Sequence, residues 1–327
     1  MIKDKLITTT LIIAGLILIF AAFAPFIFTR TISPIKFDDT GQIGDTIGGI
    51  TAPFIAGLGC FLTFMAFYIQ YRANKLQIEN INLINKKDQI NAYENKLFSM
   101  FEIHRKNVDD ISIKSLDQKR IYKGQEFFQK MIINLQNIFE MTNSIDKLDL
   151  KQKTILAYLH LFYGKSLEEN NNLRKYYNQF FYGKMDLSQG FISYKAWYFD
   201  KRYYDYGYGM LLSRYFRYQY QVIKYIDEYE FYGDDYNEEE IKNIKYNSAK
   251  QLRAQLTNDE QLLLYYNAIT PLGKSWIDNN YIKNYKLIKN IILPQSFGYT
   301  PLNWVNEELN FSNQEINKFF EFNDKFI

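Results

Sequence analysis

Acidic residues and a lysine at short spacing are the first side chains in this sequence that could do chemistry. The run GDDYNEEEIK at 233–242 places Glu240 two residues before Lys242 and shortly after Asp234 and Asp235. Carboxylates with a lysine in this order can hold Mg²⁺ and position a water molecule for hydrolysis of a phosphodiester. No apolar strands flank the run to hold it in place, so we favour a solvated acidic loop over a nuclease site.

Histidine, cysteine and glycine patterns give no further sign of a catalytic or metal site. His104 falls on the helical face of Leu97 and Phe101, and His160 is embedded in the apolar stretch LAYLHLFYG, so both are predicted to be packed core residues. Cys60, the one cysteine, also lies in an apolar stretch and cannot form an internal disulfide. The sequence has no zinc spacing, nucleophile elbow, phosphate loop or dinucleotide fingerprint. We therefore predict no metal and no cofactor, name no catalytic residue, and favour a protein that is not an enzyme.

Tyrosines and cations interleave in one segment, YYDYGYGMLLSRYFRYQYQVIKYID at 203–227. On a helical wheel that starts after Gly209, six side chains form an apolar arc: Leu212, Tyr215, Phe216, Val222, Ile223 and Ile226. The opposite arc is basic and polar, with two tyrosines at its border: Arg214, Arg217, Gln221, Lys224, Tyr218 and Tyr225. Bases could stack on such tyrosines beside phosphate contacts, but a solvated helix face gives the same pattern. Because three cations are few, we favour the solvated face and keep nucleic acid as the weaker alternative.

The composition makes no global case for nucleic acid either. The 39 Lys and Arg residues nearly balance the 36 Asp and Glu residues, which leaves a formal net charge of +3. The 18% aromatic content accompanies an enrichment in Asn, Lys and Ile that a genome rich in A and T encodes whatever the function. At 327 residues the chain is long enough for one sizeable core with appendages.

The elements that must position these side chains are predicted to be helices. Apolar residues keep helical spacing in ENKLFSMFEIH, EFFQKMIINLQNIFEM, TILAYLHLF and QLLLYYNAI, and no segment after the first hundred residues alternates like a strand with hairpin turns. Two capping boxes, Thr257 with Glu260 and Ser312 with Glu315, mark helix starts. We therefore predict a mostly α fold.

The first seventy residues are predicted to form a transmembrane hairpin. The uncharged run at 6–28 is long enough to cross a bilayer as a helix, and a second uncharged span covers about 46–71. A secretory signal cleaved after Ala22-Phe23-Ala24 is the weaker alternative for the first run, because the run is longer than a usual signal core and Pro25 follows directly. Cations near both ends of the hairpin predict a multi-pass protein of the bacterial inner membrane, with the amino terminus and the large C-terminal domain in the cytoplasm: Lys3, Lys5, Arg72, Lys75, Lys86 and Lys87.

Small residues recur at every fourth position around the start of the second span: Gly44, Gly48, Ala52, Ala56 and Cys60. This spacing lets membrane helices approach closely, either within the hairpin or between copies in a homo-oligomer, and both interpretations stay open. Pro53 allows a third arrangement, because proline prefers the first turn of a helix. In that case 41–50 is a glycine-rich entry segment and only the last three small residues lie on the helix.

The span leads into a polar connector helix at 73–96 and then the helical domain at 97–327. Leu76, Leu83, Ile90 and Leu97 repeat at seven-residue intervals, as in one seam of a coiled coil. The partner positions of that seam are polar: Asn80, Lys87 and Glu94. We favour a single polar connector helix over self-association through a coiled coil.

Several separate motifs in this order resemble phage abortive infection proteins of the AbiC type. The resemblance runs over most of the chain through five segments: GDTIGGITAPF at 44–54, LFSMFEIHRKNVDDI at 97–111, YFRYQYQVIKYID at 215–227, KQLRAQLTNDEQLLLYYNAI at 250–269 and NYKLIKNI at 284–291. The residues that match the family pattern are Gly44, Asp45, Gly48, Gly49, Arg217, Arg253 and Leu256, with Gly124 and Phe127 as a further shared position. The chain departs from the family at Gln219, where the family often has an aliphatic residue.

This resemblance implies a bacterial defence protein that stops phage propagation at the expense of the infected cell. It brings no established catalytic residue. Arg217 and Arg253 are our candidates for functional or structural anchors, because a guanidinium near an apolar helical face usually has a fixed partner. The expected partners are the lipid bilayer, further copies of the chain, and a phage or host protein as trigger. A nucleic-acid-acting enzyme and a scaffold for another membrane complex are the alternatives.

Overall fold

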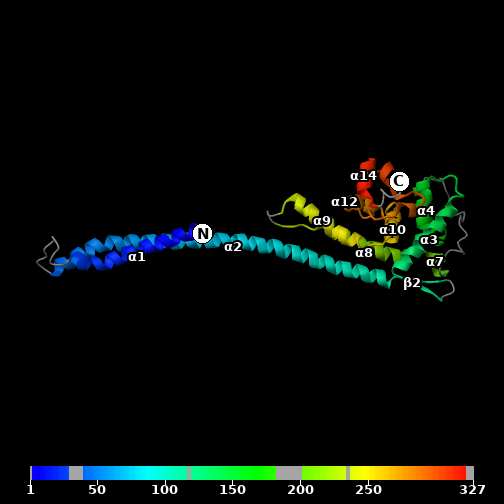
Figure 1. The fold of residues 1–327 in the computed structure, drawn as a ribbon. Coiled ribbons are helices and arrows are strands. Elements are labelled where there is room, and N and C mark those ends of the chain that lie inside the picture. Colours follow the sequence, from blue (N-terminus) through cyan, green and yellow to red (C-terminus); the bar gives the residue numbers. More distant parts are fainter. Residues whose placement is uncertain (1, 29–39, 116–118, 182–200, 233–235, 322–327) are drawn as a thin grey trace. The chain divides into compact units, whose positions relative to one another are not determined.

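The computed structural model describes residues 2–28, 40–115, 119–181, 201–232 and 236–321. These residues form α-helices almost throughout, with one short β-hairpin, so the predicted mostly α class is confirmed (Figure 1). The chain divides into two compact units, an N-terminal unit of residues 1–87 and a C-terminal unit of residues 88–327.

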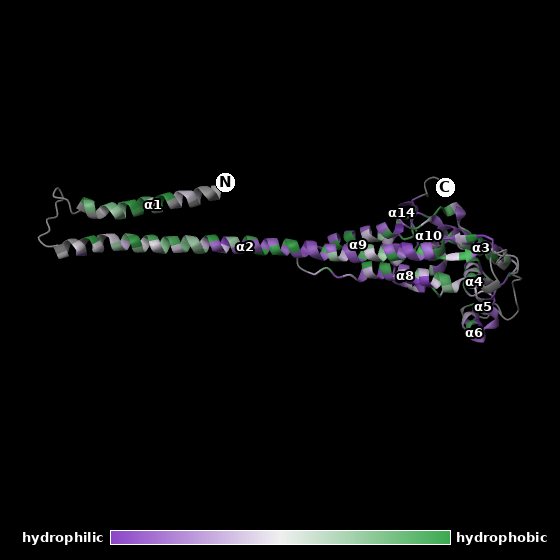
Figure 2. Cartoon of the chain, turned by 90° about the horizontal axis from the view of Figure 1, so that it is seen from below, coloured by the Kyte–Doolittle hydropathy of each residue, from purple (hydrophilic) through white to green (hydrophobic). Residues whose placement is uncertain are grey.

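The N-terminal unit consists of α1 (Ile2–Phe28) and the first part of α2 (Thr40–Asp110). The two helices contact each other through Phe20 and Phe54, whose ring centroids lie 6.0 Å apart. Ala14 and Leu58 are buried. Most other apolar side chains of this unit are exposed, and Figure 2 shows hydrophobic residues along both helices. The described part of the unit therefore leaves most of its apolar surface uncovered.

The helix α2 continues without interruption through the predicted second span and the predicted connector. It begins at Thr40, which puts Pro53 inside the helix and all five small residues of the stripe on it. The arrangement in which the helix begins at Pro53 is therefore wrong. The hydroxyls of Thr51 and Thr63 donate to the backbone carbonyls of Ile47 and Gly59, each four residues earlier, so neither needs a water partner.

Among the described residues, one helix is long and apolar enough to cross a membrane, the stretch Ile47–Asp110 of α2. The apolar stretch Thr8–Phe23 of α1 is shorter than such a span. The structure thus supports one candidate span by length and composition.

The C-terminal unit is a bundle around α10, and it begins with the last part of α2, residues 88–110. The hairpin of β1 (Ser112–Lys114) and β2 (Ile121–Lys123) is antiparallel, with Ile113 opposite Tyr122. The helices that follow are α3 (Gln125–Thr142), α4 (Leu150–Tyr163), α5 (Ser166–Glu169), α6 (Asn171–Phe180), α7 (Lys201–Tyr206) and α8 (Gly209–Glu228). The remainder are α9 (Glu238–Arg253), α10 (Asn258–Ala268), α11 (Lys274–Asp278), α12 (Tyr281–Tyr285), the 3₁₀ turn Leu293–Gln295, α13 (Pro301–Glu307) and α14 (Asn313–Phe319).

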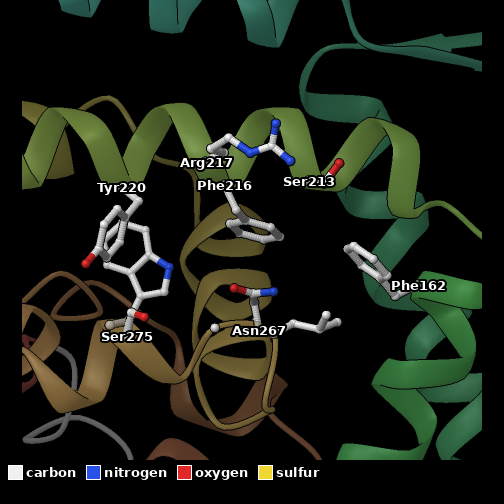
Figure 3. A pocket seen from close by; sticks show the side chains of 10 residues that line it. Phe162, Ser213, Phe216, Arg217, Tyr220, Asn267 and Ser275 are labelled. Atoms are coloured by element: carbon white, nitrogen blue, oxygen red, sulfur yellow. The ribbon is translucent and has the colours of Figure 1, made fainter. Parts of the chain in front are cut away.

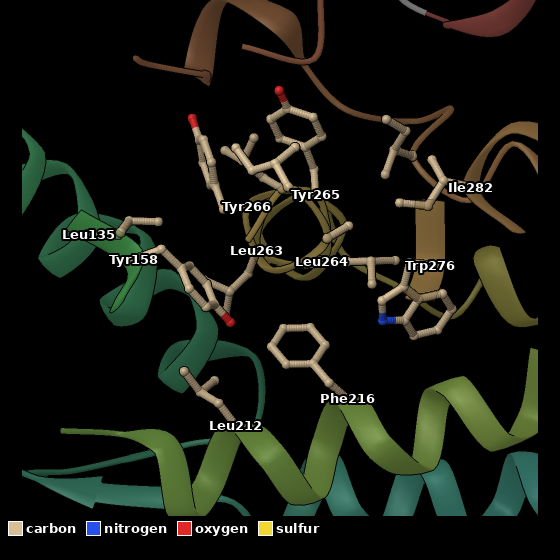
Figure 4. Close-up of a cluster of buried hydrophobic side chains, with 14 of the residues drawn as sticks. Leu135, Tyr158, Leu212, Phe216, Leu263, Leu264, Tyr265, Tyr266, Trp276 and Ile282 are labelled. Carbon is tan, nitrogen blue, oxygen red and sulfur yellow. The ribbon is translucent and has the colours of Figure 1, made fainter. Parts of the chain in front are cut away.

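The helix α10 is the centre of this unit, because it is buried on every side from Glu260 onward. Figure 4 looks down its axis and shows Tyr158 of α4, Phe216 of α8 and Trp276 of α11 around it. A helix that is apolar all round has to be enclosed by other elements. The run QLLLYYNAI forms such a helix. The predicted capping box of Thr257 and Glu260 starts this helix, and that of Ser312 and Glu315 starts α14, so both predictions are confirmed.

The helix α8 carries the tyrosine-rich segment and buries the predicted arc. All six arc residues are buried, which confirms the predicted face: Leu212, Tyr215, Phe216, Val222, Ile223 and Ile226. The other side of α8 lies along α2 in antiparallel fashion, since Tyr93 stacks on Tyr225 and Asn107 accepts a hydrogen bond from Arg214. Most of the aromatic residues in this segment therefore serve packing.

Two glycines let the start of α8 touch α4. Gly207 has a φ of +67°, and a Cβ at this position would lie 2.3 Å from the carbonyl oxygen of Phe162. A Cβ at Gly209 would lie 2.7 Å from the same oxygen. The next amide, that of Tyr208, donates to the carbonyl of Leu161. Only glycine permits this approach of two backbones.

The acidic run at 233–242 is helical in its second half, so the predicted loop is wrong for Glu240. The side chain of Asn237 caps α9, and Glu238, Glu239 and Glu240 form its first turn. Carboxylates are favoured there because the N-terminus of a helix carries a partial positive charge. Asp234 and Asp235, the other half of the run, lie outside the described residues.

Candidate functional site

A cleft of about 350 Å³ opens between α4, α8, α10 and α11 in the C-terminal unit (Figure 3). The walls of the cleft are formed by four aromatic side chains: Phe162, Phe216, Tyr220 and Trp276. Four polar side chains also line it: Ser213, Arg217, Asn267 and Ser275. No Asp or Glu is among the described residues that line it. The cleft therefore combines ring surfaces with one cation and no opposing charge.

The floor of the cleft is held rigidly. Asn267 is 4% exposed, and its Nδ2 donates to the hydroxyl of the buried Tyr158 at 3.0 Å. Gly273 passes so close that a Cβ there would lie 2.4 Å from both the carbonyl oxygen and the Oδ1 of Asn267. Trp276, 2% exposed, packs edge-to-face on Tyr220 with ring centroids 5.1 Å apart. These contacts fix the position of each polar atom on the floor.

Arg217 stands at the rim of the cleft, on the exposed side of α8. Within the described part of the chain its guanidinium makes no hydrogen bond and no ion pair. The other two cations of the basic arc have partners: Arg214 donates to Asn107 at 2.8 Å, and Lys224 lies 3.6 Å from Glu228. Of the three cations, Arg217 is thus the one that lines the cleft.

Arg253 lies in the last turn of α9 and is 5% exposed. Its Nη1 donates to the carbonyls of Tyr285 and Lys286, at 3.0 Å each. Lys286 has a φ of +49° and ends α12, so Arg253 satisfies the last carbonyls of that helix. The guanidinium holds two elements of the bundle together.

A buried polar chain crosses the unit from α2 to α10. The ring of His104 lies 5.5 Å from that of Tyr215, whose hydroxyl donates to Glu260 Oε1 at 2.9 Å. The other carboxylate oxygen of Glu260 accepts from the amide and the hydroxyl of Thr257. Burial raises the pKa of both Glu260 and Tyr215. These hydrogen-bonded residues form the capping box of α10 and pack in the core, and none of them lines the cleft.

Both histidines are buried, as predicted from their apolar surroundings. His104 is 2% exposed and His160 is fully buried, with its Nε2 3.7 Å from Glu168 Oε1. Burial lowers the pKa of His104 to about 4 and that of His160 to about 3. Both rings are therefore neutral at physiological pH.

Acid is expected to destabilise the C-terminal unit through His104. The folded pKa of about 4 lies below the unfolded value of 6.5, so the contribution to stability is complete above pH 6.5 and is lost as the pH falls toward 4. Between pH 7 and pH 5 the free energy of unfolding should fall by about 2 kcal/mol through this one residue. Urea unfolding of the protein and of His104→Phe at both pH values measures the difference. Equal losses in the two proteins would show that His104 does not titrate in this way.

The residues of the predicted small-residue stripe lie on the N-terminal unit and are exposed: Gly44, Gly48, Ala52, Ala56 and Cys60. A Cβ at Gly44, Gly48 or Gly49 would meet no described atom of another element within 4 Å. Asp45 is exposed beside them. These positions and the cleft belong to separate units.

A grouping of three or more His, Cys, Asp or Glu side chains that could hold a metal ion does not occur in the described part of the chain. Glu240 and Lys242 lie on α9, and Asp234 and Asp235 lie outside the described residues. The order of residues that suggested a nuclease thus forms no ligand set that the structure describes.

Sequence reasoning did not find the cleft, although it singled out Arg217. The residues that it missed come from four helices and a turn, among them Phe162, Ser213, Asn267, Gly273 and Trp276. One signal was present: Asn267 is the polar exception near the end of the apolar run QLLLYYNAI. A buried amide in such a run needs partners, and a cleft can provide them.

All the described residues that line the cleft except Phe162 lie inside a stretch of the chain that matches a family model. Residues 207–296 match the family model described as "Putative phage abortive infection protein". The AbiC-type resemblance is therefore confirmed over this stretch, which includes Arg217 and Arg253. The motifs at 44–54 and 97–111 lie outside the match. No significant match is found among curated proteins or among solved structures.

Proposed function

We propose that the protein is a membrane-anchored abortive infection protein, in which the hairpin of α1 and α2 crosses the bacterial inner membrane. The C-terminal unit then lies in the cytoplasm, where it senses a phage or host component. Signalling rearranges or assembles the membrane helices of several copies. The observation that carries the proposal is the family match at residues 207–296.

Exposed apolar surface supports the membrane part of the proposal. Only 6% of the most apolar window of α2 is buried against the rest of the described chain. Large side chains on both helices of the N-terminal unit are more than half exposed, among them Ile12, Phe23, Phe64 and Phe67. In water such a surface would associate or aggregate, whereas hydrocarbon covers it without cost.

An enzyme that acts on nucleic acid gains no support from the described residues. Of the basic arc on α8, Arg214 and Lys224 are occupied by Asn107 and Glu228. One remaining arginine is too little charge for a strand of phosphates.

Defence is tested by infecting bacteria that express the full chain or an empty vector. We expect the number of plaques to fall by orders of magnitude, while infected cells at high multiplicity die without releasing phage. Matched expression of Gly207→Ala, in which the new Cβ would clash with the backbone of α4, controls for the load of making the protein. Unchanged plating across a broad phage panel would contradict the proposal.

Cys60 is expected to be shielded by lipid, since it lies in the middle of the predicted second span. A water-soluble maleimide should therefore label it slowly in intact membranes and rapidly after SDS denaturation. Asn80→Cys in a Cys60→Ser background is the matched control. It lies nine residues beyond Tyr71, which is about 14 Å along the helix, and should be labelled in membranes. Equal rates at the two positions would contradict insertion of α2.

A further inference from the structure

The floor of the cleft offers one hydrogen-bond donor and one acceptor that nothing in the described chain uses. The indole Nε1 of Trp276 donates to no described residue, and in Figure 4 it lies on the side of the ring that faces Phe216. The Oδ1 of Asn267 accepts no hydrogen bond from the described residues, while the Nδ2 of the same amide donates to the hydroxyl of Tyr158. Both side chains are more than nine-tenths buried, so the cleft is the route by which partners reach them.

The rim of the cleft adds a cation that is also unused. In Figure 3 the guanidinium of Arg217 extends along α8 toward Ser213, and it has no acidic partner among the described residues. A guanidinium can bind a phosphate through two parallel hydrogen bonds. Because none of the described residues that line the cleft carries a carboxylate, an anionic group is the charge that fits here.

We propose that the cleft binds a nucleoside monophosphate, with the phosphate at Arg217 and the base between the aromatic walls. The edge of a base carries both hydrogen-bond donors and acceptors. A donor could pair with the Oδ1 of Asn267, and an acceptor with the Nε1 of Trp276. Its flat faces suit the rings of Phe216 and Tyr220. The volume of about 350 Å³ lies in the range of small-molecule sites.

Competing ligands fit these groups less well. A single arginine suits one phosphate, whereas di- and triphosphates are usually held by several cations or a metal ion. An aromatic carboxylate, such as the C-terminal phenylalanine of a peptide, would satisfy Arg217 and the rings. Its phenyl ring would leave Asn267 and Trp276 unpaired. The nucleotide is therefore the ligand that pairs with Arg217, Asn267 and Trp276 at once.

Calorimetric titration of the purified full chain in nanodiscs tests the proposal. The probes are the four ribonucleoside monophosphates, with the corresponding nucleosides, inorganic phosphate and N-acetylphenylalanine for comparison. At least one monophosphate is expected to bind saturably and about 10-fold or more tighter than its nucleoside or inorganic phosphate. Arg217→Ala should weaken that binding by about 10- to 100-fold, and Arg217→Lys by less.

Two further variants separate the cleft from the fold. Arg214→Ala, three residues away on α8 but outside the cleft, should leave the affinity unchanged. Trp276→Phe keeps a ring and removes the N–H, so it should weaken binding about 10-fold. Since Arg217 is exposed, its replacement tests the site without risk to folding.

Three results would overturn the assignment. These are no saturable binding of any monophosphate at 1 mM, binding that Arg217→Ala leaves unchanged, and tighter Arg217-dependent binding of N-acetylphenylalanine, which would indicate a peptide carboxylate. The titration uses purified protein and does not rest on the defence function. Loss of either conclusion therefore leaves the other standing.

Discussion

Replacing Gly207 by alanine is expected to lower the free energy of unfolding of the C-terminal unit by at least about 4 kcal/mol. The φ of +67° alone makes alanine unfavourable by roughly 1–2 kcal/mol. In addition, the new Cβ would lie 2.3 Å from the carbonyl oxygen of Phe162 and 2.5 Å from the amide nitrogen of Gly164. Both are backbone atoms, so α8 and α4 must move apart and loosen the core between them.

Urea unfolding followed by tryptophan fluorescence measures this loss, because all three tryptophans of the chain lie beyond residue 87. Gly124→Ala is the matched control. Its φ is also positive, at +54°, but the nearest atom to its Cβ is 3.8 Å away. The control should therefore show backbone strain without the clash, and Gly207→Ala should be the less stable by about 2 kcal/mol or more. Equal losses would mean that the close approach of α4 and α8 contributes nothing.

Arg253→Met is expected to destabilise the same unit by about 3 kcal/mol. Methionine keeps the apolar part of the side chain but removes both hydrogen bonds to the carbonyls of Tyr285 and Lys286. Those carbonyls end α12 in a buried part of the bundle, where an unpaired acceptor costs roughly 1–3 kcal/mol. The loss is measured by the same urea unfolding.

Lys250→Met isolates the carbonyl bonds from the general effect of charge. Lys250 lies in the same last turn of α9 and is exposed, so both residues interact with the helix dipole. Its replacement should change the free energy of unfolding by less than about 1 kcal/mol. A loss as large as that of Arg253→Met would assign the effect to charge at the helix end and contradict the anchoring role.

Local patterns in the sequence predicted the parts of the fold that local forces decide. The buried face of α8 follows from the spacing of Leu212, Phe216 and Ile223, because a helix has one period. The capping box of Thr257 follows from a contact across three residues. Burial of His104 follows from its position on the face of Leu97 and Phe101.

The cleft could not be predicted in this way, because its residues meet only after four helices have packed. Phe162 lies 55 residues before Arg217, and the floor depends on Gly273 passing over Asn267. The acidic run misled for a related reason. A series of glutamates reads as a solvated loop, but after Asn237 it is also a good first turn of a helix. Whether the loop or the helix forms depends on whether later residues of the segment, such as Ala249 and Leu252, are buried in the core.

Infection of cells that express residues 73–327 alone tests whether defence requires the membrane helices. Cells that express the full chain or residues 73–327 at equal levels are infected, and plating efficiency and infected-cell survival are measured. Circular dichroism and tryptophan fluorescence establish that the shorter chain is folded. We expect protection from the full chain and none from the folded fragment, because the fragment lacks the helices that carry the response. Equal protection by residues 73–327 would contradict action at the membrane and place the activity in the C-terminal unit alone.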